Sequence, residues 1–486
     1  MAPLGRAASM GRWCLVGLLA HLCPAEAQIR VMAPESLVNR LSDSQGRIDG
    51  STATFGAPFY GQRLLGRLVW GESITNHTHC RETDYSVPEP DQNSVLHHEH
   101  NEVQLIHIII VRRGKCSFVT KVRVAQTKGA HAVIIVDKED STLTTHDIRN
   151  IIVADDGYGN TVDIPSMLVA KKEGQYLIDA ARTSEQVIVE LAWDVPTDHV
   201  VLVDMWMSSA SLESLHFLKE WTSKRKALNE AIKFVPHYHV FGMQATSDYN
   251  DLCTDTSAQY CAEDPDGSGP ITGSMVLDED VRQLCIHEIY KVQRADTERI
   301  SLAGHKVEYS KEYWDYVEML MEHCPIDGTD PDSRFGKVCS EKLMNKVGID
   351  PAKIQHCVDT TREIKLRDQR DHTAWSPRAL RINGWRYTGA MDADLVTRAI
   401  CAGFVTMPKA CDELISAPHP VLKMLMPVRG GVKLSQFVTA LVVVSCLAVA
   451  ALMLYKRSLT RHIHSALREE VMLEVQAQMD SYKQMS

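Results

Sequence analysis

Cysteine is the residue type in this sequence with the widest chemistry, because a thiolate can attack disulfides, hold a metal or form a structural bridge. The chain has 13 cysteines; Cys14 and Cys23 lie in a short apolar N-terminal segment, and Cys446 lies in a long apolar run. The other 10 are spread over the body between these two segments. An even number in an oxidising compartment is typical of disulfides, so we predict bridges rather than a metal centre or a catalytic thiol.

Five histidines form the densest histidine group in the chain, and such a group could bind a metal. The group comprises His77, His79, His97, His98 and His100. Imidazoles at such spacing can chelate a metal, but no cysteine pair or acidic ligand accompanies them in a recognised spacing. Two other interpretations stay open: an exposed loop without further function, and a pH sensor whose protonation loosens a bound partner in acidic compartments. We predict no metal and no cofactor.

Motifs of the common hydrolases are not found in the sequence. There is no Ser-His-Asp arrangement in a recognisable setting and no zinc motif of the His-Glu-x-x-His type. Residues 263–269, EDPDGSG, hint at a calcium loop but lack the alternating ligands and the distal glutamate, so we interpret them as a turn. The formal net charge of -10 makes nucleic acid a poor partner. We therefore predict no catalytic residue and a protein that is not an enzyme.

A long apolar run near the C-terminus indicates where the body resides. Residues 437–454 are apolar or small and carry no charged side chain. At about 1.5 Å per residue, and extended to 434–455, the run reaches the ~30 Å of a bilayer core. The sequence predicts a transmembrane helix over 434–455, a linker over 416–433 and a tail over 456–486.

The N-terminus predicts the side of the membrane that the body occupies. Arg6 and Arg12 precede a short apolar segment, and Ala25-Glu26-Ala27 has small residues at the two positions that signal peptidase reads. We predict a signal peptide over residues 1–27, and hence a single-pass type I protein with a lumenal body and a cytosolic tail. Asn76, in an Asn-x-Thr sequence, is then predicted to carry a glycan on a surface loop.

The first part of the body alternates short apolar runs with turns. Runs rich in Val and Ile at 105–111 and 132–136 predict strands covered on both faces. Between them, residues 119–128 carry apolar side chains at near-helical spacing and end at Gly129. We expect further strands at 68–70 and 187–191.

The turn of this unit carries a family resemblance. Residues 112–137, RRGKCSFVTKVRVAQTKGAHAVIIVD, resemble the signature of the protease-associated domain, and residues 55–70 fit the start of that domain. The resemblance is to plant vacuolar sorting receptors, whose cargo-binding loop has the form RGDCxF. It implies a protease-associated domain over 28–193 and a cargo-binding loop at its turn. The loop residues are Arg113, Gly114, Lys115, Cys116, Ser117 and Phe118.

The resemblance also implies a role for several loop residues. Arg113 would donate to a peptide carbonyl or carboxylate, Gly114 would permit a tight turn, and Phe118 would pin the loop onto the core. Lys115 stands where the family has Asp, so a cation replaces an anion beside the expected cargo peptide. Cys80 is the only other cysteine of this module, so we predict a Cys80–Cys116 disulfide; a buried thiol is the alternative.

The second part of the body, 194–415, has elements of a thioredoxin-type fold. Residues 200–206 predict a buried strand, and residues 212–229 an amphipathic helix. Residues 376–389 resemble the proline-strand-turn-strand of that fold, in which the proline is cis, and Asn383-Gly384 independently predicts a hairpin turn. A helical, cysteine-bearing insertion is expected over about 240–370, and it too resembles the receptors' central region. The predicted fold class is α/β and α+β multidomain.

One feature of the thioredoxin enzymes and one of the receptor family are missing from this sequence. Trp206 is followed by Met207-Ser208-Ser209-Ala210, where thioredoxin enzymes carry two cysteines separated by two residues, so the domain is predicted to be redox-inactive. The linker 416–433 has no cysteine, so the receptors' epidermal-growth-factor-like repeats are missing too. The eight cysteines from Cys253 to Cys411 allow many pairings, and the sequence favours none.

The tail completes the functional prediction. Tyr482 followed by Met485 resembles the sorting signal read by clathrin adaptors, although the family's usual signal differs. The resemblance implies a sorting receptor that binds soluble cargo proteins through peptide determinants. It would reside in Golgi, trans-Golgi network and endosomal or prevacuolar membranes and deliver cargo to a vacuole or lysosome-like compartment. A membrane-tethered thiol-disulfide oxidoreductase and a protease-related enzyme stay open as alternatives.

Overall fold

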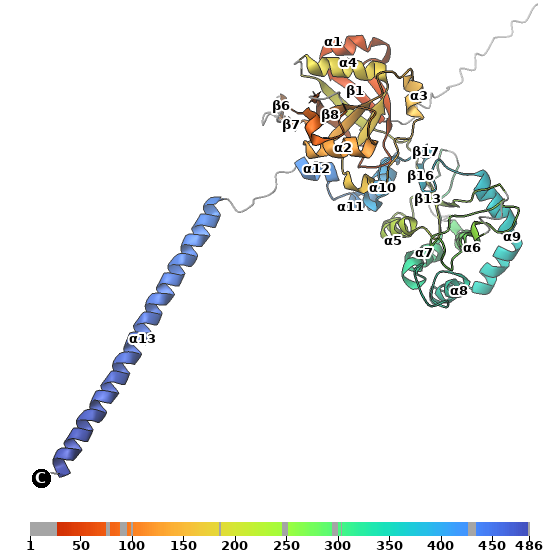
Figure 1. The fold of residues 1–486 in the computed structure, drawn as a ribbon. Helices are drawn as coiled ribbons and strands as arrows, with labels where there is room; N and C mark the ends of the chain where they lie inside the picture. The colour runs from red at the N-terminus through yellow and green to blue at the C-terminus, as the bar shows by residue number, and fades with distance from the viewer. Residues whose placement is uncertain are drawn as a thin grey trace, which may run out of the picture. The chain divides into compact units, whose positions relative to one another are not determined.

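A computed structural model describes residues 27–73, 78–87, 95–98, 101–183, 186–244, 251–293, 300–302, 304–425 and 434–484. The chain divides into two compact units, Met1–Lys423 and Met424–Ser486 (Figure 1). The predicted signal peptide, except its last residue, and the predicted glycosylation site Asn76 lie outside the described residues.

The N-terminal part of the first unit is a closed barrel with the strand order β1-β11-β3-β8-β9-β10-β2. Strands β3, β8, β9 and β10 pair in parallel, whereas β1, β2 and β11 close the barrel by antiparallel pairs. The central strands are buried along their length, as their Val and Ile runs predict. The strands are β1 (Ala27–Ala33), β2 (Arg47–Thr52), β3 (Arg63–Trp70), β8 (Ile106–Arg112), β9 (Ala132–Val136), β10 (Ser166–Val169) and β11 (Ile188–Trp193).

Four helices flank the barrel, and two short two-stranded ribbons are separate from its sheet. The ribbons pair β4 (Glu72–Ser73) with β5 (Tyr85–Ser86) and β6 (Val95–His98) with β7 (Asn101–Gln104). Helix α2 begins where the Ser117 hydroxyl accepts from the backbone N–H of Thr120. Its Val119, Val122 and Ala125 are buried, which confirms the apolar spacing expected between β8 and β9. The helices are α1 (Glu35–Arg40), α2 (Phe118–Thr127), α3 (Thr145–Arg149) and α4 (Lys171–Arg182).

The second module is built on a sheet with the order β14-β15-β13-β12-β16-β17. The predicted strand at 200–206 is β12, which pairs in parallel with β13 and antiparallel with β16. Asn383 and Gly384, with φ of 51° and 80°, form the predicted two-residue hairpin between β16 and β17. The strands are β12 (Val201–Met207), β13 (Ile232–Tyr238), β14 (Val292–Gln293), β15 (Glu308–Tyr309), β16 (Ala379–Ile382) and β17 (Trp385–Arg386).

Helices cover this sheet, and disulfides connect them. Helix α5 (Leu212–Ala227) follows β12 directly, as the amphipathic pattern predicts. The other helices of this part are α6 (Gly273–Tyr290), α7 (Lys311–His323), α8 (Lys337–Lys346), α9 (Pro351–Asp371), α10 (Ala393–Ala402) and α11 (Lys409–Leu414). The pairing that the sequence left open is Cys253–Cys261, Cys285–Cys357, Cys324–Cys339 and Cys401–Cys411.

The expectation of a cis proline at Pro377 is wrong. The cis peptide bond among the described residues is Ala33-Pro34, in the barrel. The two isomers of an X-Pro bond differ by only about 0.5–1 kcal/mol, so the surrounding structure, rather than the local sequence, selects between them.

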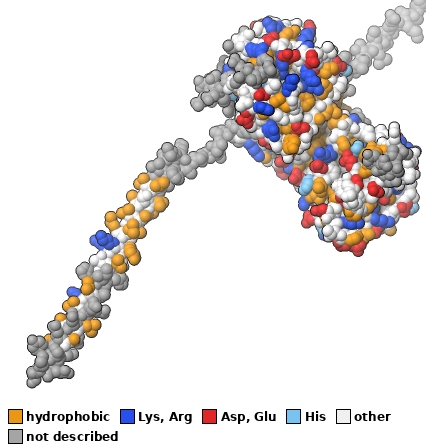
Figure 2. Space-filling view, in the orientation of Figure 1, with side chains coloured by type: hydrophobic (Ala, Val, Ile, Leu, Met, Phe, Trp, Pro, Cys, Tyr) orange, Lys and Arg blue, Asp and Glu red, His pale blue; other side chains and the backbone are white. Residues whose placement is uncertain are grey.

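Two helices end the chain, α12 (Pro420–Leu425) and α13 (Leu434–Gln484). Residues Leu441–Arg461 of α13 have a mean hydropathy of 1.7 and are not buried, so this helix is long and apolar enough to cross a membrane. Figure 2 shows hydrophobic side chains along this part of α13. Helix α13 continues without a break from the apolar run through the predicted tail to Gln484.

Candidate functional site

The loop that the sequence singles out leaves the barrel at the C-terminal end of β8 and enters α2. Gly114 and Lys115 both have positive φ, 117° and 71°, and Gly114 and Cys116 form an isolated β-bridge. This tight turn exposes the Lys115 side chain and leaves its neighbours half-buried. A fixed backbone therefore presents a single exposed ammonium group at the tip of the loop.

Arg113 is held by an internal partner that the sequence reasoning missed. Its Nη1 donates to Oδ1 of Asp137 at 3.0 Å, and the Asp137 side chain is only 1% exposed. The Arg113 guanidinium carbon also lies 5.4 Å from the centroid of the Phe118 ring. Asp137 directly follows the run 132–136, and the carboxyl ends of parallel β8 and β9 share one edge, so the sequence did contain a signal for this pair. Arg113 anchors the loop with part of its guanidinium.

A disulfide and a buried lysine hold the loop from behind. Cys80 and Cys116 are bonded, with their Cα atoms 5.9 Å apart, which is the pair named from the sequence. The ammonium group of Lys121 is fully buried; it donates to the Thr78 carbonyl and lies 3.6 Å from the Cys80 sulfur. Burial lowers the pKa of Lys121 to about 8, although the nearby negative charge of Asp84 acts to raise it. The backbone N–H of Cys80 in turn donates to Asp84 Oδ2 at 2.9 Å.

The histidine group falls partly outside the described residues. His77 and His100 are not described, and His97 and His98 are described only as backbone of β6. His79 belongs to the core, because its ring lies 5.1 Å from Trp70 and 4.8 Å from Tyr85, between centroids. Within the described ranges, no group of three or more His, Cys, Asp or Glu residues is placed to hold a metal ion.

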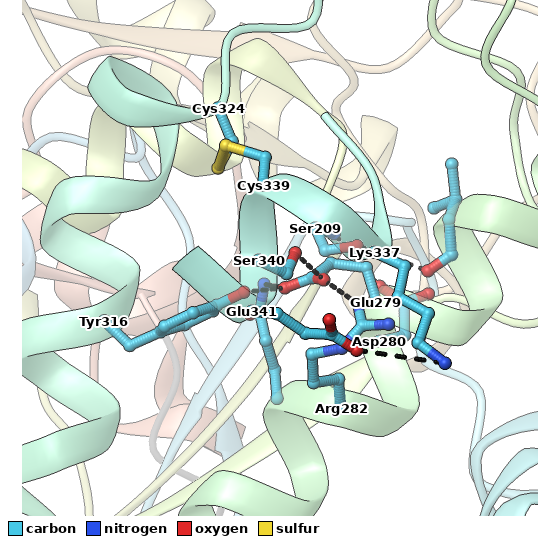
Figure 3. Close-up of polar contacts among 12 residues, drawn as sticks. Ser209, Glu279, Asp280, Arg282, Tyr316, Cys324, Lys337, Cys339, Ser340 and Glu341 are labelled. Carbon is cyan, nitrogen blue, oxygen red and sulfur yellow. Dashed lines mark hydrogen bonds and ion pairs between the residues drawn. A yellow bond between two sulfur atoms is a disulfide. The ribbon is translucent and has the colours of Figure 1, made fainter. Parts of the chain in front are cut away.

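The places of the missing thiol pair are occupied by Met207 and Ala210, with two buried serines between them. Ser209 is 2% exposed, and its backbone N–H donates to Oδ1 of Asp280 at 3.1 Å. Figure 3 shows Ser209 and Asp280 next to each other. Asp280 is itself 1% exposed, and burial raises the pKa of its carboxyl to about 8. A neutral carboxyl therefore lies behind the segment in which disulfide exchange would require a thiolate.

Next to it, Glu279 organises a second set of buried polar groups. Its carboxylate accepts from Tyr316 at 2.8 Å, from Ser340 at 2.7 Å and from the Arg282 guanidinium (Figure 3). Glu279 is 0% exposed, so these partners replace the water that a buried charge has lost. Since they come from α6, α7 and α8, the cluster ties the three helices together, and the Cys324–Cys339 disulfide lies beside it. This is a structural network that the sequence reasoning missed.

The predicted tail signal is only partly described. Tyr482 lies in the last turn of α13, and Met485 lies outside the described residues.

Comparison with known proteins gives both modules a family. Residues 65–177 match the family model of the PA domain, and residues 202–401 match that of the vacuolar sorting receptor thioredoxin-like domain. Vacuolar-sorting receptor 1 of Pisum sativum is 27% identical over 413 residues, which cover 79% of this chain. Vacuolar-sorting receptor 4 of Arabidopsis thaliana is 26% identical over 414 residues. The chain is similar to the vacuolar sorting receptors over both modules.

The relationship to the vacuolar sorting receptors covers the two modules and not the whole of those proteins. The chain spans 60% of the length of the pea and Arabidopsis receptors. A shorter match, 29% identical over 139 residues, links 28% of the chain to the human ER degradation-enhancing alpha-mannosidase-like protein 3.

The solved structures that align with this chain do so only weakly. Reduced DsbA of Mycobacterium tuberculosis aligns with 44% of this chain and 88% of its own at a TM-score of 0.26 and 10% identity. An aminopeptidase from Aneurinibacillus aligns with 35% of this chain and 30% of its own at a TM-score of 0.22 and 21% identity. Scores this low carry no inference about fold or activity.

Proposed function

We propose that this chain is a single-pass sorting receptor that binds soluble cargo proteins through peptide determinants at the 112–118 loop. The observation that carries the proposal is collinearity: a PA domain and a vacuolar sorting receptor thioredoxin-like domain occur in that order, followed by an apolar helix. Relatives named as vacuolar-sorting receptors match over about four-fifths of the chain.

The loop has the physical properties of a binding surface. Its backbone is fixed by a disulfide, a buried lysine and the Arg113–Asp137 ion pair, so little conformational entropy is lost when a peptide binds. Lys115 is the exposed charge at its tip. An ammonium group attracts carboxylates, so the loop favours cargo peptides with an acidic residue near the bound segment.

A receptor of this kind works in the secretory pathway. The body is lumenal, Asn76 carries a glycan, and the protein resides in Golgi, trans-Golgi network and endosomal or prevacuolar membranes. Tyr482 and Met485 bind clathrin adaptor subunits, which direct the receptor and its cargo to a vacuole or lysosome-like compartment. The thioredoxin-like module acts as a scaffold rather than an enzyme, since Met207 and Ala210 stand where disulfide exchange needs thiols.

A charge reversal at the loop tip tests cargo binding. The full-length chain in detergent micelles is incubated with soluble lumenal proteins, and the captured proteins are quantified by mass spectrometry. Lys115→Asp removes the ammonium group without touching the Arg113–Asp137 pair. Lys409→Asp on α11 is the matched control, because Lys409 is also exposed and the charge change is the same. We expect Lys115→Asp to lose or replace the captured set and the control to keep it; identical sets for all three proteins would overturn the proposal.

The orientation is tested separately by protease protection of sealed vesicles. A lumenal body is protected from protease added outside, whereas the short tail after the apolar helix is removed. Digestion of the body from the cytosolic side would contradict the receptor function regardless of the cargo result.

A further inference from the structure

The first unit contains a cleft of about 330 Å³ between the barrel and the sheet of the second module. A volume of this size is in the range of ligand sites. The cleft is distinct from the 112–118 loop, none of whose residues line it. Its barrel side includes Arg149 and Asp194, and its sheet side includes Trp375, Arg381, Trp385 and Arg386.

The two walls are connected by buried contacts, so the cleft is preformed. The Tyr60 hydroxyl of the barrel accepts from the backbone N–H of Thr388 at 2.9 Å and donates to the Thr388 carbonyl at 3.0 Å. The Tyr60 ring stacks on Tyr387 with 5.4 Å between centroids. At the cleft itself, Nη2 of Arg386 donates to the Ser51 hydroxyl of β2 at 3.4 Å. A ligand that binds here touches both modules at once.

The charge of the cleft is opposite to that of the chain. Three guanidinium groups line it against one carboxylate, Asp194, whose charge is partly matched by Arg63 at 3.8 Å. The whole chain, in contrast, has a formal net charge of -10. Guanidinium groups bind carboxylates through paired, charge-assisted hydrogen bonds, so the cleft is suited to acidic groups.

The aromatic wall adds a second specificity. The guanidinium carbons of Arg381 and Arg386 lie 5.5 and 5.7 Å from the centroid of the Trp375 ring, and Arg381 also lies 5.1 Å from that of Trp206. These cation–π contacts orient the guanidinium groups. Trp375 and Trp385 are both half-buried and line the cleft, so apolar side chains can pack on them.

We propose that this cleft is a second binding site, for an acidic peptide segment of a soluble protein, with carboxylates on the arginines and apolar side chains on the tryptophans. A simple inorganic anion would use the arginines but not the aromatic wall. The site does not depend on cargo binding at the 112–118 loop, and the experiment separates the two.

Binding of a synthetic peptide tests the site in the full-length chain in detergent micelles. The probe is a fluorescein-labelled octapeptide with two glutamates flanked by leucines and with both ends blocked; its twin has glutamines in place of the glutamates. Arg381→Gln is the test variant, and Arg378→Gln is the matched control, because Arg378 is exposed and does not line the cleft. Fluorescence anisotropy gives the Kd of each pair.

We expect the glutamate peptide to bind and the glutamine twin to bind at least about 10-fold more weakly, since a charge-assisted contact is lost. Arg381→Gln weakens binding by about the same factor and Arg378→Gln by less than about two-fold. Each variant is measured in a Lys115→Asp background, so that the exposed ammonium group of the 112–118 loop does not contribute to the signal. Arg149→Gln on the barrel side gives a second test, with melting curves to show that each variant is folded. Equal affinities for Arg381→Gln and Arg378→Gln, or displacement of the peptide by an equivalent concentration of inorganic phosphate, would overturn the proposal.

Discussion

Replacement of Asp280 by asparagine is expected to remove an unusual pH dependence from the stability of the second module. Burial raises the pKa of the Asp280 carboxyl from 3.8 to about 8, so it is protonated in the folded chain near neutral pH. The unfolded chain releases this proton above about pH 4. The stabilising contribution of the proton is therefore fully present below about pH 4 and is lost as the pH rises toward about 8.

The size of the effect follows from that pKa difference. Within this window, stability changes by about 1.4 kcal/mol per pH unit, so folding is about 2 kcal/mol less favourable at about pH 7 than at about pH 5.5 from this group alone. The asparagine side chain cannot titrate but can still accept from the backbone N–H of Ser209. We expect Asp280→Asn to flatten this slope and to raise the free energy of unfolding most at the upper end of the range.

Urea unfolding of the full-length chain between about pH 5 and 8, followed by tryptophan fluorescence, measures the slope. Asp278→Asn is the matched control, because Asp278 lies on the same helix but its side chain is 45% exposed and paired with Arg362. Buried histidines also contribute pH dependence, but they are common to all three proteins and cancel in the difference. An Asp280→Asn slope identical to that of the parent chain would refute the buried, protonated carboxyl.

Three further outcomes concern the barrel and its contacts. Removing the Cys80–Cys116 disulfide by serine substitution at both positions opens a loop with a sequence separation of 36 residues, and urea unfolding is expected to show a loss of about 3–4 kcal/mol. Burial lowers the pKa of His419 to about 4, so its contribution to stability is complete above about pH 6.5 and falls on acidification. The parent chain should therefore lose about 1 kcal/mol of stability from this group between about pH 7 and 5.5, and His419→Phe should remove that loss. Tyr60→Phe leaves the buried Thr388 N–H without its acceptor, and should cost about 1–3 kcal/mol in the same assay.

Each of these outcomes has a control in the same chain. Replacing Cys401 and Cys411, whose sequence separation is only 10, should cost less than opening the longer loop. His146→Phe and Tyr158→Phe should each leave stability at neutral pH unchanged, because both side chains are exposed. A control that matched its test variant would mean that the burial or loop-length argument is wrong.

Local sequence patterns predicted the elements around the candidate loop well. The buried runs at 105–111 and 132–136 became β8 and β9, and the spacing of Val119, Val122 and Ala125 gave α2. These patterns succeed because burial on two faces and a 3.6-residue period are properties of short segments. The Asn383-Gly384 hairpin was equally local, since both residues tolerate positive φ.

Contacts between distant segments could not be predicted in this way. The buried Lys121 and the cluster around Glu279 each join residues that only the folded chain brings together. The cis proline was misassigned for a related reason, since the isomer of an X-Pro bond depends on its tertiary surroundings.

The sequence by itself determined which segments are apolar, where the chain turns, and that no thiol pair follows Trp206. Only the tertiary structure decided which of the eight central cysteines pair, which charges are buried, and that arginines and tryptophans from two modules line one cleft. The physical reason is that composition and periodicity act over a few residues, whereas burial, pKa and pairing depend on atoms that are close in space and far apart along the chain.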